Sequence, residues 1–386
     1  MDSASDLQTE TFPYDAVVAE FRRVGKHFVS PGLLAQLDRL RTLLPEDADA
    51  RLARFLHTAL DKFDGRYDNP SYLALDQLEL PGADGCPDRR HAQRVRDRLL
   101  VLLMADMMRF ELEATAHDRP DPRVTAKRCR HGLRVMRPAL RRLGLPTDFD
   151  DTEPTGAAQQ VCEAVFVGMS AAERRKLQLT ALPVSLVHDE YMFIRALQSY
   201  ETSFALMAVQ LKVAVTALDR GDAAAATSAI DAAAEALGEA SPVWSLVGTM
   251  RTESFLTFRE FTDGASAIQS RNYKDVEASC RRPEPGRLDS PAYHSVPEIR
   301  ERVLAGQRNL DDAFEGAALV ADEREAVRAA MDRFEAAIFK WRKTHHSVAV
   351  RMLGERRGTG DTDGVRYLAQ ARTIPVFKPR CPFGHS

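Results

Sequence analysis

ADEREAVRAAMDRFEAAIFKWRKTHHSVAVRMLGERRGTGDTDG, residues 321–364, is the stretch that decides the fold. Its apolar residues recur at alternating steps of four and three, which places one set on a single helix face: Val327, Met331, Phe334, Ile338, Trp341, His345, Val348 and Met352. All are large and apolar except His345. A neutral imidazole on such a face needs a partner for its second nitrogen, which a carbonyl, a carboxylate or a metal can provide. The pattern alone favours a structural histidine over a metal ligand.

Composition and charge describe an ordinary soluble globular protein. The chain has 386 residues, 44% of them hydrophobic and 28% charged, which is enough for one large or two modest domains. A formal charge of −3 gives no reason to expect nucleic acid or an anionic membrane surface as a partner. The acidic, polar N-terminus MDSASDLQTETF does not resemble a signal peptide. Five scattered cysteines without a CxxC or CxxCH motif predict reduced thiols in a cytoplasmic protein.

The remaining pattern predicts an all-α fold, a helical bundle with a buried core. Residues 188–218 repeat the four-three spacing, and we expect further helices over residues 14–28, 31–44, 50–63, 94–112, 123–143, 223–237 and 242–261. The proline-bearing residues 281–298 predict a loop. The acidic turn formers of residues 145–156 predict a boundary between an N-terminal helical region, residues 1–150, and a second domain, residues 151–386.

Several familiar catalytic motifs are missing from the sequence. It contains no Walker loop, no HExxH helix and no GxSxG nucleophile elbow, and the acidic loop near residue 361 departs from the calcium-binding pattern. No residue therefore stands out as a catalytic acid, base or nucleophile. Two candidates remain beside His345. Arg259, in SFLTFREF, is flanked by Phe255 and Phe258, which predict that it lies on a buried face. A buried arginine would meet an anion, either a structural carboxylate or a ligand. Thr359 lies in a glycine-rich loop that is either a plain helix stop or a binding loop.

Three blocks resemble tryptophan 2,3-dioxygenase and the related haem-dependent aromatic oxygenases. HDEYMFIRALQSYE resembles the HDExLFIxxHQxxE helix of that family. FLTFREFTDGASAIQSRNYKDVE is similar to its YxxFRxxLxxxSGFQSxxYRxIE block. WRKTHHSVAVRMLGERRGTGDTDGVRYL resembles WRxxHxxxVxRxxGxKxGTGGxxGxxYL. The blocks lie within residues 188–368, whereas the first 170 residues have no counterpart.

The resemblance implies a helical bundle around a haem pocket and a role for each candidate residue. His345 matches the proximal ligand of the haem iron, and Trp341 is implied to contact the haem. Arg259 matches the residue that binds the substrate carboxylate, and Phe193 matches an apolar wall of the distal pocket. Thr359 matches the threonine that meets the substrate ammonium group and a haem propionate. Without a CxxCH motif, the haem is expected to be non-covalent haem b.

The sequence also departs from the family on the substrate side. Leu197 stands where the family has a distal histidine, and Phe255 stands where it has a pocket tyrosine. Asp361 replaces a loop glycine. The resemblance therefore implies an oxygenase that uses dioxygen on L-tryptophan, a substituted tryptophan or another aromatic amino acid. The expected reaction is that of a dioxygenase, which cleaves the ring to an N-formylkynurenine-type product.

Three alternatives stay open at this point. One is a monooxygenase of a natural-product pathway that makes hydroxylated or oxindole products. Another is a relative that binds haem and an amino acid without turnover. The third is a haem-free helical interaction protein. The sequence does not decide the role of the N-terminal region or whether the chain forms a homo-oligomer.

Overall fold

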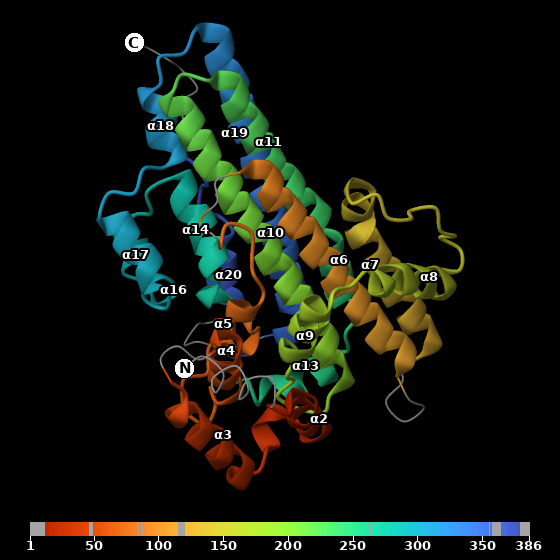
Figure 1. Ribbon diagram of the computed structural model, residues 1–386. Helices are drawn as coiled ribbons and strands as arrows, with labels where there is room; N and C mark the ends of the chain where they lie inside the picture. Colours follow the sequence, from red (N-terminus) through yellow and green to blue (C-terminus); the bar gives the residue numbers. More distant parts are fainter. Residues whose placement is uncertain are drawn as a thin grey trace, which may run out of the picture. The chain divides into compact units, whose positions relative to one another are not determined.

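The computed structural model describes residues 12–45, 49–83, 85, 88–114, 120–262, 265–354, 356 and 364–378. Within these ranges every element of secondary structure is a helix, so the all-α prediction is confirmed (Figure 1). The three cysteines of this part, Cys129, Cys162 and Cys280, are free thiols in buried positions. The structure therefore builds its core from packed helices alone wherever it is described.

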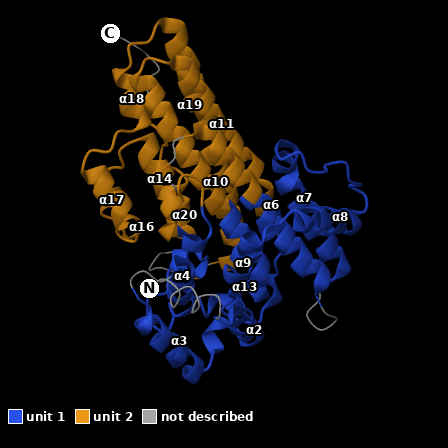
Figure 2. Ribbon diagram, viewed as in Figure 1, with its two compact units in different colours: residues 1–79, 99–199, 245–267 blue, residues 80–98, 200–244, 268–386 orange. Residues whose placement is uncertain are grey.

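The chain forms two compact units, each assembled from several segments (Figure 2). Unit 1 comprises residues 1–79, 99–199 and 245–267, and unit 2 comprises residues 80–98, 200–244 and 268–386. Each unit thus takes residues from both sides of position 150. The sequence-based boundary rests on the turn formers of residues 145–156 and not on contacts between residues, so it stays a prediction.

Unit 1 consists of short and medium helices around a core that includes Phe21, Phe55 and Leu60. Gly25, with φ of 83°, permits a close backbone approach because a Cβ there would lie 2.8 Å from the Cα of Ser185. The helices that lie entirely in this unit are α2 (Tyr14–Val24), η1 (Lys26–Phe28), α3 (Pro31–Leu43), α4 (Ala50–Ala59), α5 (Asn69–Tyr72), η2 (Leu75–Gln77), α7 (Pro122–Arg142), α8 (Pro154–Val167), α9 (Ala171–Leu179) and α13 (Thr252–Arg259).

Unit 2 is organised around α19 (Ala321–Leu353) and α11 (Ala223–Ala240), which pack against each other and run side by side in Figure 1. The buried face of α11 is largely alanine, which lets the two backbones approach closely. The other helices of unit 2 are α14 (Arg271–Cys280), α15 (Pro285–Leu288), α16 (Pro291–His294), α17 (Pro297–Leu304), α18 (Leu310–Gly316) and α20 (Val365–Ala371).

Four helices contribute residues to both units: α6 (Arg89–Glu113), α10 (His188–Asp219), α12 (Pro242–Val247) and η3 (Ala267–Gln269). The most apolar window of α10 has a mean hydropathy of 1.3, which is enough for a membrane span by composition. However, 78% of that window is buried inside the protein. The apolar character of α10 is therefore explained by its position as a core helix.

Two details of the helix prediction were wrong. The helix expected over residues 242–261 is broken into α12 and α13, which residues 248–251 separate. The loop expected over residues 281–298 contains α15, α16 and the start of α17. Each of these three helices has proline in its first turn, where the missing N–H costs no hydrogen bond. The prolines that predicted a loop therefore begin helices.

Candidate functional site

His345 lies in unit 2 on α19, within an aromatic cluster that we define as Tyr200, Phe204, Trp244, Tyr273, Trp341 and His345. Its imidazole stacks on the indole of Trp244, with ring centroids 4.9 Å apart and planes 19° from parallel. The indole of Trp341 lies 5.3 Å away at 54°. Aromatic surfaces thus fix the orientation of the histidine ring, and the protein presents it on a largely apolar wall.

The protonation state of His345 suits a metal ligand. Burial among these rings and, to a smaller extent, the neighbouring His346 lower the pKa of His345 to about 4. The imidazole is therefore neutral at physiological pH and keeps a lone pair that can bind a metal. Within the described ranges, neither ring nitrogen of His345 makes a hydrogen bond to another residue.

The apolar face of α19 is open around His345. Ile338 and Met352 are each 2% exposed, as predicted for core positions. Between them, Trp341, His345 and Val348 are only partly buried. Large apolar side chains that retain accessible surface in the middle of a buried face indicate a place where a further group can pack.

We tested whether these residues fit a haem, the cofactor that the resemblance implies. The residues that the structure describes contain no group of three histidine, cysteine, aspartate or glutamate side chains close enough to hold a metal ion. A haem brings four nitrogen ligands of its own and takes one histidine from the protein, together with apolar and aromatic contacts. The neutral imidazole of His345, its lack of a hydrogen-bond partner and the partly open wall fit that requirement.

Unit 1 contains the residues predicted for the substrate side. Phe193 on α10 packs against Phe255 and Phe258 of α13, with ring centroids 5.9 Å and 5.3 Å away. Phe193 and Leu197 are the two side chains between Tyr191 and Ser199 that are not fully buried. Phe255 is also partly exposed, so these three residues form an apolar surface that is accessible from one side.

The two predicted polar residues have different outcomes. Arg259 is the last residue of α13, next to the buried Phe258, and its side chain is partly exposed rather than fully buried as its neighbours suggested. An arginine at a helix end keeps its charged head accessible more easily than one in the middle of a buried face. Thr359 lies outside the described residues.

The first sequence block also contains residues that hold α10 in place. Glu190 is fully buried and accepts hydrogen bonds from the backbone N–H groups of Val184 (2.6 Å) and Ser185 (3.0 Å). Asp189 pairs with the buried guanidinium of Arg128 at 2.5 Å. Glu190 thus satisfies two backbone N–H groups of the chain that enters α10, and Asp189 pairs with the buried cation of Arg128. Both acids therefore have a structural role.

Glu190 predicts a pH dependence of stability. Burial raises its pKa from 4.5 to about 7 despite the hydrogen bonds that it accepts. The folded state then binds more protons than the unfolded state between these pH values, so the contribution of Glu190 falls as the pH rises through this window. We expect the difference in unfolding free energy between wild type and Glu190→Gln to decrease by roughly 3 kcal/mol from pH 4.5 to 7.

Urea unfolding at a series of pH values measures this difference, and Glu163→Gln is the matched control because that side chain is exposed on α8. The unfolding free energy of Glu163→Gln should change with pH as that of wild type does. If the unfolding free energy of Glu190→Gln also changes as that of wild type does between pH 4.5 and 7, the raised pKa of Glu190 is contradicted.

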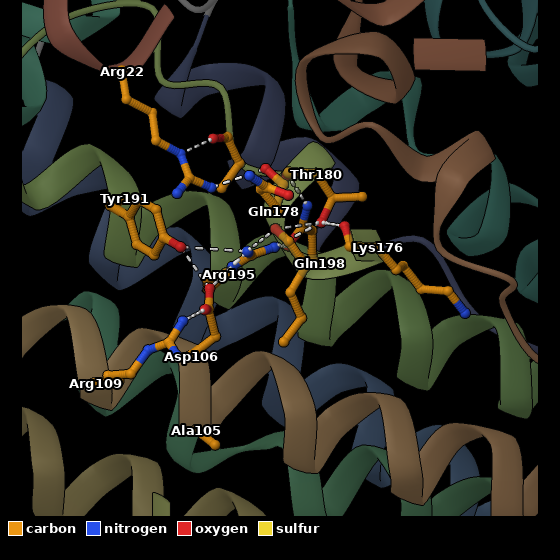
Figure 3. A network of polar contacts seen from close by, with 12 residues as sticks. Arg22, Ala105, Asp106, Arg109, Lys176, Gln178, Thr180, Tyr191, Arg195 and Gln198 are labelled. Carbon is orange, nitrogen blue, oxygen red and sulfur yellow. Dashed lines mark hydrogen bonds and ion pairs between the residues drawn. The ribbon is translucent and has the colours of Figure 1, made fainter. Parts of the chain in front are cut away.

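A second buried network in unit 1 joins α6, α9 and α10 (Figure 3). Arg195 is completely buried and donates to Asp106 Oδ2 from Nε at 2.9 Å. The phenol of Tyr191 donates to the same oxygen at 2.5 Å. Burial alone would raise the pKa of Asp106, but Arg195 and Tyr191 outweigh it and hold that pKa below its usual value. This network fixes α10, which carries Phe193 and Leu197, against α6 and α9.

Three residues that contact His345 or hold α19 in place were not predicted from the sequence. Trp244, one of two tryptophans in the chain, stacks on His345 although it lies outside the three blocks. Glu277 and Arg342 lie inside the blocks and form an ion pair, with Arg342 Nη2 3.3 Å from Glu277 Oε1. Arg342 Nε also donates to Tyr273 OH at 2.7 Å, so these residues tie α14 to α19. Glu277 and Arg342 could have been found from the sequence, because both lie within the blocks that resemble the family.

The described part of the chain is thus an all-α protein in which the neutral imidazole of His345 lies on an aromatic wall. No family model matches the chain. The chain is 25% identical over 227 residues to the tryptophan 2,3-dioxygenase of Xanthomonas campestris pv. campestris (strain B100), covering 49% of this chain and 76% of that protein. It is 26% identical over 234 residues to the tryptophan 2,3-dioxygenase of Bradyrhizobium sp. (strain ORS 278), covering 50% and 83%.

The tryptophan 2,3-dioxygenase of Anaeromyxobacter dehalogenans (strain 2CP-C) is similar to the same degree, with 25% identity over 228 residues that cover 50% of this chain and 86% of that protein. The resemblance inferred from the three sequence blocks is thereby confirmed. The chain is distantly similar to these tryptophan 2,3-dioxygenases, which supports its assignment as an enzyme at the level of the family.

Proposed function

We propose that the chain is a haem-dependent oxygenase that uses dioxygen on L-tryptophan, a substituted tryptophan or a related aromatic amino acid. The observation that carries the proposal is the neutral, partly accessible imidazole of His345 against the indole of Trp244. The distant similarity to tryptophan 2,3-dioxygenases supports the same reaction class.

On the cofactor side, His345 would bind the iron of a non-covalent haem b. The bound haem would supply the activation of dioxygen. Trp341, partly accessible on the same helix face, would pack against it, and Thr359 would donate to a haem propionate. Trp244 stacks on the His345 ring and would keep its ligating nitrogen in one orientation. The chain's own contribution here is to bind and orient the cofactor.

On the substrate side, Arg259 would bind the carboxylate of the amino acid, and Thr359 would also accept from its ammonium group. Phe193, Leu197 and Phe255 would contact the aromatic ring, since all three retain accessible apolar surface. None of these three side chains can take or give a proton. The residues proposed here would therefore act by positioning the substrate and excluding water rather than by acid–base catalysis.

The substitutions on the substrate side, relative to the family, favour a second candidate reaction. Leu197 and Phe255 leave an indole N–H without the histidine and phenol found at these positions in the family. A monooxygenase that forms a hydroxylated or oxindole product is therefore the alternative to a dioxygenase that opens the ring to an N-formylkynurenine-type product. A relative that binds haem and an amino acid without turnover would have the same binding residues.

One experiment separates these reactions. The ferrous, haem-loaded protein is incubated with a panel of tryptophan and tyrosine derivatives under ¹⁸O-labelled dioxygen, and mass spectrometry counts the labelled atoms in each product. Two labelled atoms support the dioxygenase and one supports the monooxygenase. A spectral change on amino-acid addition without any product supports the non-catalytic relative, and the absence of a Soret band contradicts haem binding.

Replacing Arg259 with leucine tests the substrate assignment. We expect Arg259→Leu to weaken binding of the amino acid by about 2–3 kcal/mol, because the carboxylate loses a charged hydrogen bond. The dissociation constant is measured by the shift of the Soret band during amino-acid titration. Arg220→Leu, at an exposed position of the chain, is the matched control and should bind as wild type does. Unchanged binding by Arg259→Leu would exclude the carboxylate role.

A further inference from the structure

Unit 2 contains a pocket of about 430 Å³ on the side of α19 that carries Ile338 and Arg342. It is lined by residues of α14, α15, α16 and α19 and by residues 373–376, and His345 does not contribute to it. The lining is mostly apolar and includes Val276, Ile338 and Val376. The volume lies within the range of pockets that bind small organic molecules.

The polar groups of this pocket carry more positive than negative charge. Glu277 is the common partner of three cations: Lys274 Nζ lies 2.8 Å, Arg287 Nη2 3.2 Å and Arg342 Nη2 3.3 Å from its carboxylate oxygens. Burial would raise the pKa of Glu277, but the three cations outweigh it and lower that pKa to about 2. One carboxylate therefore faces three positive side chains, each of them mostly buried.

Four further charged side chains lie on or near this pocket. Arg281 lines the pocket together with Glu284, which is largely exposed and 4.0 Å from it, so this pair is neutral and lies at the rim. Asp311 and Glu335, near the buried Cys280, accept hydrogen bonds from the backbone N–H groups of Lys378 and Val376. Within the lining itself, Arg281, Arg287 and Arg342 stand against the two carboxylates of Glu277 and Glu284. An anionic ligand in the pocket would therefore interact favourably with the guanidinium groups of Arg287 and Arg342.

Tyr293 provides an independent indication of a ligand. Its side chain lines the pocket and is completely buried, yet its hydroxyl has no hydrogen-bond partner in the described structure. A buried phenol without a partner costs free energy, and nearly all such groups in native proteins are paired. A ligand oxygen in the pocket would accept this hydrogen bond and would also meet the cations of Arg287 and Arg342.

We propose that this pocket binds a small organic carboxylate with a flat apolar body, at a site separate from the haem and substrate residues described above. Its carboxylate would accept from Tyr293 OH and compensate the charge of Arg287 and Arg342. Its body would pack on Val276 and Ile338. Burial raises the pKa of the Cys280 thiol far above its usual value, so that thiol stays protonated and the site is one of binding rather than covalent chemistry.

The test uses 2-naphthoate and its neutral analogue 2-naphthamide, which share one aromatic body and differ in charge. Each is titrated by isothermal calorimetry into the full, haem-loaded chain. We expect 2-naphthoate to bind more tightly than 2-naphthamide. Tyr293→Phe, which removes only the hydroxyl, should weaken 2-naphthoate about fivefold, and Arg287→Gln should weaken it about tenfold or more. Arg287→Gln should change the affinity for 2-naphthamide much less than the affinity for 2-naphthoate, because the amide carries no charge. Neither variant should change the haem absorption.

Two controls fix the location of binding. Arg282→Gln removes the same charge from an exposed neighbouring position and should bind 2-naphthoate as wild type does. Arg259→Leu should retain this binding as well, because Arg259 belongs to the proposed substrate site. The proposal is overturned if wild type does not bind 2-naphthoate or binds both probes equally. It is also overturned if Tyr293→Phe and Arg287→Gln both match Arg282→Gln, or if Arg259→Leu abolishes the binding.

Discussion

Alanine in place of His345 is expected to abolish stable haem binding, seen as the loss of the Soret band after purification from cells supplied with iron and a haem precursor. The reason is that this imidazole combines three properties in the described structure: it is neutral at physiological pH, it makes no hydrogen bond, and Trp244 fixes its ring. Without the bond from His345 to its iron, a haem would be held mainly by apolar contacts, which are not directional.

The matched control for this change is His346→Ala. His346 follows in the chain but lies about 100° further around the helix, and its Nδ1 is 3.4 Å from Arg372 Nη1 at the surface. We expect His346→Ala to keep the full Soret band and the same ratio of haem to protein. If His346→Ala loses the haem and His345→Ala retains it, the ligand assignment is wrong. Circular dichroism of both variants checks that the helical fold is intact.

The fold was predictable from the sequence where one apolar face runs without interruption. The helices expected around Phe193 and His345 are both present, because the four-three spacing extends over the whole of α10 and α19. Prediction failed where short helices begin at proline, as at Pro285 and Pro291. A helix of four residues is too short to have a recognisable period, so its prolines predict a loop instead.

The site was predictable only in part, for a different physical reason. Helical spacing placed His345 on an apolar face, but it could not reveal that the face is open between Ile338 and Met352, since accessibility depends on residues far away in the chain. Trp244 was missed for that reason, because its contact with His345 joins positions about a hundred residues apart. Arg259 was expected to be buried from its neighbours alone, whereas its position at a helix end leaves it partly exposed.

The sequence blocks also mix two kinds of residues that pattern alone does not separate. Glu190 and Arg195 lie in the same block as Phe193, yet both are fully buried and hydrogen-bonded, while Phe193 is partly accessible. A polar side chain that satisfies buried groups keeps a helix in position, and an apolar side chain with accessible surface can contact a ligand. Only the structure makes this distinction, and it shows that Glu190 and Arg195 hold α10 in position.

Loss of Asp106 is expected to have the largest effect on stability, about 3–5 kcal/mol for Asp106→Ala. The change leaves the fully buried guanidinium of Arg195 without its carboxylate and deprives the phenol of Tyr191 of its acceptor. The midpoint of urea unfolding, followed by circular dichroism, measures the effect. Asp151→Ala is the matched control, because its pair with Arg137 is largely exposed and should contribute less than about 1 kcal/mol.

The double variant Asp106→Leu/Arg195→Met separates the cost of an unpaired charge from the value of the pair. Removing both charges from a buried site restores much of the stability that the single change loses, because no uncompensated ion remains. We therefore expect the double variant to unfold at a higher urea concentration than Asp106→Ala. If Asp106→Ala unfolds at the same midpoint as Asp151→Ala, the buried pair does not stabilise α10. If the double variant is less stable than Asp106→Ala, the remaining contacts of Arg195 with Thr180 and Gln198 stabilise this helix more than its charge pairing does.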